Sequence, residues 1–233
     1  MTRQPPTARQ FYEAFVSAMG RSWTDPVFRE TYGDAKAWTP SVINLLGRVG
    51  AEEFHYTDNE DSERSITTEY YRVDQCWFSY WPTEPDLKGS WSLDVAIEHE
   101  NAKDQYRFEV RKLLALRCPL RVVIGYSGVA DPEADPMPPG SIQRRTLEAW
   151  LRGPEGGTPG SSWGDGDFLL LLGKWVDSST PPRWRGYMLR PEAPWITEPS
   201  LELGSEPSWS LGCVIGGTTL RPVSGILRGR GPS

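Results

Sequence analysis

A ten-residue segment, WSLDVAIEHE at 91–100, sets acidic side chains into an otherwise strand-like apolar pattern. Alternation along a β-strand places Asp94, Glu98 and Glu100 on one face, around the small Ala96, and the larger apolar residues on the other face. Burying several carboxylates without a partner costs several kcal/mol per ion. We therefore expect either a bound cation on this face or, as the alternative, an edge strand whose acidic face is solvated.

A second acid lies in the preceding apolar stretch, which predicts a strand from Glu69 to about Trp81. Asp74 lies in the middle of this stretch, although aspartate is depleted in strands because it prefers local backbone hydrogen bonds. A salt bridge to Arg72 is one explanation, and a metal-ligand position facing Glu98 is the other. Mg²⁺ or Mn²⁺ takes oxygen ligands and keeps several waters, so two or three carboxylates suffice.

The order of predicted elements indicates an α/β fold with a mixed central sheet and helices on both faces. Hydrophobic spacing predicts helices over 10–20, 40–53, 103–118 and 141–152, strands over 69–81, 91–100, 120–127, 167–176 and 183–191, and a polar loop over 57–65. The chain is long enough to build a core. We expect one domain, made of an N-terminal helical part (1–65), an α/β core (66–195) and a C-terminal strand with a loose tail (196–233).

Lys112 is a third candidate, because its helix directly follows the acidic strand and must pack near it. The lysine head could reach the carboxylates, or it could lie along the surface in water.

Three stretches of the sequence, TEYYRVDQCWFSY, LDVAIEHEN and YRFEVRKLLALRCPLRVVIGYS, together resemble the core of the restriction-endonuclease-like PD-(D/E)XK nucleases. The resemblance covers about residues 66–127. In that family an acid on or beside one strand precedes an E-x-K or E-x-E pair on the next strand. Glu98 and Glu100 match the E-x-E pair, and Asp74 is the best match for the preceding aspartate.

The remaining positions match the family less closely. Asp94 is the second choice for the aspartate, and Glu69 matches an additional glutamate that some members carry. Glu100 replaces the lysine of the commonest motif, and Lys112 on the following helix is a candidate for a relocated lysine.

The resemblance implies a Mg²⁺- or Mn²⁺-dependent nuclease that hydrolyses phosphodiester bonds. Asp74 and Glu98 would hold the metal, and Glu100 or Lys112 would orient or deprotonate a water. The alternative is a catalytically inactive nuclease-fold module that binds nucleic acid or protein. The missing motif lysine and the net charge of −6 favour that alternative. A third hypothesis is an unrelated α/β protein.

Arginines supply a candidate nucleic-acid surface. Arg144 and Arg145 share one predicted helix, and Arg183 and Arg185 lie in a predicted strand with Trp184 between them, a pattern suited to phosphate contacts and base stacking. Scattered solvated arginines that balance 31 acids are an equally good explanation. DNA is the expected partner, and a homodimer is left open. No apolar run reaches the length of a signal peptide or a membrane span, which predicts a cytoplasmic protein without a membrane partner.

Overall fold

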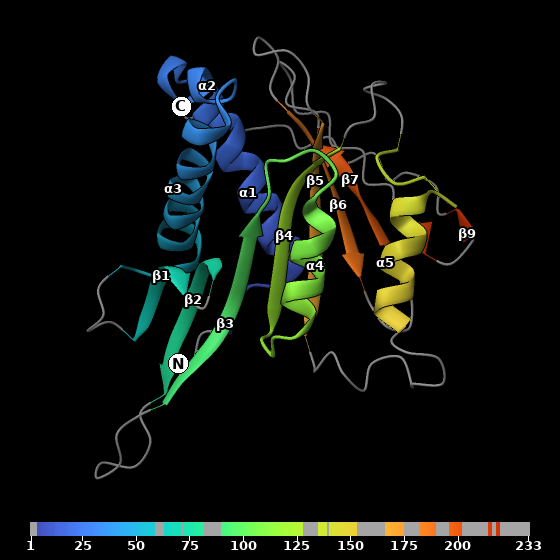
Figure 1. The fold of residues 1–233 in the computed structure, drawn as a ribbon. Coiled ribbons are helices and arrows are strands. Elements are labelled where there is room, and N and C mark those ends of the chain that lie inside the picture. Colours follow the sequence, from blue (N-terminus) through green and yellow to red (C-terminus); the bar gives the residue numbers. More distant parts are fainter. Residues whose placement is uncertain are drawn as a thin grey trace, which may run out of the picture.

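The computed structural model describes residues 4–58, 63–70, 72–81, 90–127, 135–138, 140–152, 166–174, 182–189, 196–201, 214–215 and 218–219. Its centre is a seven-stranded sheet with the order β1-β2-β3-β4-β5-β6-β7 (Figure 1). The strands are β1 Arg64–Tyr70, β2 Val73–Trp81, β3 Ser90–His99, β4 Leu120–Ser127, β5 Asp167–Lys174, β6 Arg183–Leu189 and β7 Ile196–Leu201, and a separate short pair comprises β8 Val214–Ile215 and β9 Thr218–Thr219.

The sheet is mixed, as the sequence predicts. Strands β1, β2 and β3 pair antiparallel, β3, β4 and β5 pair parallel, and β5, β6 and β7 again pair antiparallel. The fully buried β4 lies at the middle of the sheet, where a strand covered on both faces must be apolar. The predicted α/β class with a mixed sheet is confirmed.

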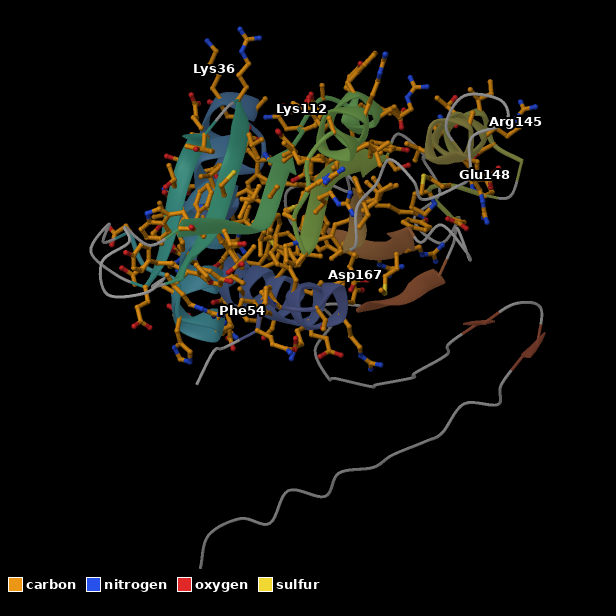
Figure 2. The ribbon with its side chains drawn as sticks, turned by 90° about the horizontal axis from the view of Figure 1, so that it is seen from below. Lys36, Phe54, Lys112, Arg145, Glu148 and Asp167 are labelled. Carbon is orange, nitrogen blue, oxygen red and sulfur yellow. The ribbon has the colours of Figure 1, made fainter. Side chains whose placement is uncertain are left out.

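Helices cover both faces of the sheet, which is the predicted arrangement (Figures 1 and 2). On one face lie α1 Ala8–Trp23 and α3 Ala35–Phe54, with α2 Pro26–Thr31 packed against both. Their core with the sheet is rich in aromatic side chains, including Trp38, Trp77 and Trp184. On the other face lie α4 Tyr106–Leu114 and α5 Ile142–Arg152, over a second core.

The N-terminal helices begin earlier than predicted. Helix α3 begins at Ala35 rather than at Pro40, because the Asp34 side chain accepts a hydrogen bond from the Lys36 backbone N–H at 2.9 Å and caps the helix. Pro40 therefore lies inside the helix. The extra first turn carries the fully buried Trp38, whose packing offsets the loss of one backbone hydrogen bond. Helix α2 was not predicted from the sequence.

The single strand predicted over 69–81 is wrong, since this stretch contains a hairpin. Tyr70 at the end of β1 pairs directly with Val73 at the start of β2, and Arg72 has a positive φ of 63°. Part of the predicted loop 57–65 therefore belongs to β1. The turn carries none of the Asn-Gly or Asp-Gly signals that usually mark such hairpins, so the pattern read as one strand.

A β-bulge overturns the predicted alternation at Asp94. Trp77 pairs with Val95 but Phe78 pairs with Leu93, so Asp94 is an extra residue in β3. The bulge turns the Asp94 carboxylate to the face covered by α1 and α3. There it accepts hydrogen bonds from Tyr56, at 2.7 Å, and from Ser79. The expected common face for Asp94 and Glu98 is therefore wrong.

The remaining elements follow the prediction with small changes. Helix α4 is shorter than the predicted 103–118, whereas β4 and α5 match. Most of the predicted tail 196–233 lies outside the described residues. Within the described ranges, no helix is both long and apolar enough to cross a membrane.

Candidate active site

Two of the predicted acids meet at the end of β3. The antiparallel register sets Gln75 opposite Ile97, so Asp74 lies beside the last residues of β3. The His99 backbone N–H donates a hydrogen bond of 2.7 Å to the Asp74 carboxylate. This bond fixes Asp74 next to Glu98. The Asp74 charge raises the pKa of Glu98, and a hydrogen bond with Glu98 lowers the pKa of Asp74.

Lys112 reaches the same place from α4. Its Nζ lies 2.7 Å from Glu98 Oε1 and 2.6 Å from Glu109 Oε2, and it donates a hydrogen bond of 2.9 Å to the carbonyl oxygen of Arg72. The ammonium group therefore ties together β3, α4 and the turn between β1 and β2. Glu98 is only 1% exposed, whereas the Lys112 side chain is 37% exposed. The cluster thus lies at the boundary between core and solvent. We call Asp74, Glu98, Glu109 and Lys112 the acid–lysine cluster.

Sequence reasoning missed Glu109. Its signal was present, because residues three apart on a helix are neighbours and Glu109 precedes Lys112 by that spacing. The charged pair also lies beside the apolar stripe of α4, which places it at the edge of the core rather than on the outer surface.

Burial dominates the electrostatics of the acid–lysine cluster. Desolvation raises the pKa of Glu98 to about 8, and the Asp74 charge adds to this rise, while Lys112 opposes it. Desolvation also raises the pKa of Asp74, against the His99 N–H and the Lys112 charge. For Lys112, burial lowers the pKa, but the hydrogen bonds to Glu109 and Glu98 outweigh it, so its pKa is raised. Three carboxyl groups thus interact with a single lysine, so binding of an additional cation would stabilise their ionised forms.

The side chain of His99 points to the opposite face, as alternation predicts. Its Nε2 lies 3.2 Å from the hydroxyl of Tyr126, and this hydroxyl accepts a hydrogen bond from the Trp38 indole N–H. Burial lowers the pKa of His99 to about 3, so the imidazole is neutral at ordinary pH. The buried group anchors the end of β3 and so supports the backbone that holds Asp74.

The other predicted acids lie away from the acid–lysine cluster or are engaged elsewhere. Glu100 accepts a hydrogen bond of 2.7 Å from the Ala102 backbone N–H and so stabilises the turn after β3. Glu69 is exposed on β1 and has a positive φ of 53°. With Asp94 on the opposite face, Asp74 and Glu98 are the pair that the structure brings together.

This pair can be tested against the metal that the resemblance implies. The carboxyl groups of Asp74 and Glu98 are hard oxygen donors at one place in the structure, and a divalent cation with several waters needs only two of them. Asp74 and Glu98 therefore fit Mg²⁺ or Mn²⁺. Across the ranges that the structure describes, no three His, Cys, Asp or Glu side chains are grouped so as to hold a metal ion. The donor set is a carboxylate pair beside a lysine.

The arginines of the predicted nucleic-acid surface have different surroundings in the structure. Arg185 lies 3.3 Å from Asp135, and Arg144 lies 3.3 Å from Glu148 on α5. Arg183 is half-buried at the start of β6. Arg145 lines a shallow hollow on α5, on the same side of the sheet as Lys112 (Figure 2).

Trp184 is 0% exposed and packs in the core beneath α1. Its predicted role as a base-stacking residue among these arginines is therefore wrong.

Comparisons with protein-family models, with curated proteins and with solved structures found no match to this chain.

Proposed function

We propose that this protein is a Mg²⁺-dependent nuclease with a restriction-endonuclease-like core, and that the acid–lysine cluster is its active site. One observation carries the proposal. Asp74 and Glu98 lie side by side on adjacent strands, and Lys112 lies 2.7 Å from Glu98. This is an acid, acid and lysine set of the kind that the sequence resemblance implies, with the lysine supplied from α4. DNA as the substrate, a cytoplasmic location and a homodimer stay predictions.

The residues of the cluster divide the chemistry between them. A divalent cation held by Asp74 and Glu98 would polarise the scissile phosphate and lower the pKa of a bound water. Lys112 lies at the solvent side of Glu98, where its ammonium group would contact a phosphate oxygen or orient the attacking water. Glu109 holds Lys112 from one turn earlier on α4. Glu100 is the weaker candidate for the water-orienting role because it stabilises its own turn.

The test is a cleavage assay with labelled single-stranded and double-stranded DNA and RNA in the presence of Mg²⁺ or Mn²⁺. The wild type should cleave at least one substrate. Glu98→Gln and Lys112→Met should each lower the rate about 100-fold or more, the usual range for removing a group that acts in proton transfer or charge stabilisation. Glu148→Gln, which changes an acid on α5, is the matched control and should keep the wild-type rate. Full activity in Glu98→Gln would contradict the proposal.

One observation favours a second candidate, a non-catalytic module for nucleic-acid or protein binding. The Lys112 ammonium is paired with both Glu98 and Glu109, so the cluster is partly compensated without any metal. Under this hypothesis the wild type cleaves none of the substrates, and stabilisation by Mg²⁺ or Mn²⁺ without any cleavage would support it. Metal-dependent stabilisation together with cleavage would exclude it.

A further inference from the structure

Two exposed aromatic side chains flank the acid–lysine cluster. We propose that they form a stacking surface for unpaired bases, so that the cluster acts on single-stranded nucleic acid. The assignment of a substrate class to this site rests on the proposed function, but the binding itself does not require cleavage.

Phe108 is the first of these side chains. It is 58% exposed and lies on α4 one turn before Lys112. The buried stripe of this helix, formed by Tyr106, Val110 and Leu113, faces the sheet. Phe108 lies off that stripe, on the flank that also carries Lys112, because residues four apart are neighbours on a helix. A large ring is thus held in solvent on a rigid element beside the charged groups.

Tyr70 is the second. It is 42% exposed at the end of β1, and its ring packs edge-on against Phe78 with ring centroids 5.1 Å apart. Phe78 packs against the core under α4, so Tyr70 lies on the same face of the sheet as that helix. Two residues further on, the carbonyl of Arg72 accepts the hydrogen bond from Lys112. Tyr70 therefore lies beside the turn that Lys112 contacts, and Phe108 lies on the helix that carries Lys112.

The segment that carries Phe108 has a charge opposite in sign to that of the whole chain. Residues 103–117 carry five basic side chains (Lys103, Arg107, Arg111, Lys112 and Arg117) and two acidic ones (Asp104 and Glu109), a balance of +3, whereas the chain has a net charge of −6. Arg72 and Arg111 are exposed. This local excess suits contact with a phosphate backbone.

A surface that combines aromatic rings with basic groups should bind single-stranded nucleic acid in preference to a duplex. Exposed aromatic rings beside basic groups bind single strands, because unpaired bases present faces on which the rings can stack. In a duplex the bases are stacked on one another, and a protein reads it through the groove edges and the phosphates. Phe108 and Tyr70 present large, partly exposed aromatic rings beside basic groups, which favours a single strand.

The test measures binding without cleavage. Fluorescence anisotropy would follow a labelled oligothymidylate of about 20 nucleotides, longer than a typical ~4–16 nucleotide site, in EDTA and low salt. The probes are the wild type, Phe108→Ala, Tyr70→Ala and Trp91→Ala. Trp91 is the matched control, because it is also an exposed aromatic residue (47%) on the same sheet but lies at the opposite end of β3 from Glu98. Because all three side chains are exposed, the variants should fold, and circular dichroism would verify this.

We expect the wild type to bind the single strand more tightly than a duplex of the same length. Phe108→Ala and Tyr70→Ala should each weaken binding about 5-fold or more, from the usual energy of one base–aromatic stack, and Trp91→Ala should bind like the wild type. Equal affinity for duplex, undiminished binding in Phe108→Ala, or no binding at all would overturn the inference. Single-strand binding without cleavage in Mg²⁺ would leave the inference standing and reject the proposed nuclease. Cleavage of a duplex, without tighter binding to the single strand, would support the proposed nuclease and reject the inference.

Discussion

The buried Glu98 carboxyl should make the metal-free protein less stable as pH rises. Its pKa is raised from an ordinary 4.5 to about 8, mainly by desolvation. Between these two values the folded protein holds a proton that the unfolded chain has released, and this proton stabilises the fold. The stabilisation is complete below pH 4.5 and is lost as pH rises through about 8.

The size of this effect follows from the two pKa values. Each unit of pKa difference corresponds to about 1.4 kcal/mol. At pH 6.0 proton binding by Glu98 contributes roughly 3 kcal/mol, and by pH 8.5 nearly all of this contribution is lost. The wild type should therefore lose roughly 2–3 kcal/mol from this group between the two pH values. Glu98→Gln has no proton to lose at this site and should lack that component.

The assay is urea unfolding of the wild type and Glu98→Gln in EDTA at pH 6.0 and 8.5, where EDTA removes metal that would replace the proton. Other groups titrate in both proteins, so only the difference between the two pH dependences is interpreted. We expect Glu98→Gln to gain roughly 2–3 kcal/mol relative to the wild type on going from pH 6.0 to 8.5. Identical pH dependences in the two proteins would refute the reasoning, because they would mean that Glu98 ionises in the folded state as easily as in the unfolded chain.

Three further variants test the acid–lysine cluster and the packing on the two faces of the sheet. Lys112→Met should lower the free energy of unfolding by roughly 1–3 kcal/mol at pH 8.5 in EDTA, because it leaves the Glu98 charge without its partner. Urea unfolding should show a much smaller loss when the same change is made in the Glu98→Gln variant. An equal loss in both proteins would contradict an ion pair between Lys112 and Glu98. Gly125→Ala places a Cβ 2.5 Å from Tyr106 Cβ, so it should push α4 outward and destabilise by about 1–3 kcal/mol; an unchanged unfolding midpoint would contradict that close approach. Tyr126→Phe removes the hydroxyl group that accepts a hydrogen bond from the buried Trp38 indole N–H. Thermal unfolding should show that the free energy of unfolding falls by about 1–3 kcal/mol. An unchanged stability would mean that another acceptor binds the indole N–H.

The sequence was most informative where periodicity and burial act together. The apolar run at β4 and the amphipathic spacing of α4 gave both elements, because a buried strand and a helix covering it have few alternative patterns. The order of these elements then predicted that Lys112 could approach Glu98. The structure has the two side chains 2.7 Å apart.

Local backbone events were beyond prediction from one sequence. The bulge at Asp94 shifts a single residue to the other face, and neither its neighbours nor its type mark the position. The hairpin at Arg72 has a positive φ without glycine or asparagine. In both places pairing between strands decides the geometry, and such pairing is a tertiary property. The solvent-exposed Phe108 likewise cannot be told from a core residue by its type.

The most direct measurement of the central claim is thermal unfolding of the wild type and Glu98→Ala with EDTA or with millimolar Mn²⁺. If Asp74 and Glu98 form a metal site, Mn²⁺ raises the unfolding temperature of the wild type, since a ligand that binds only the folded state stabilises it. The same addition then leaves Glu98→Ala unchanged. Equal shifts in both proteins, or no shift in the wild type, would contradict the claim that this carboxylate pair binds a divalent cation.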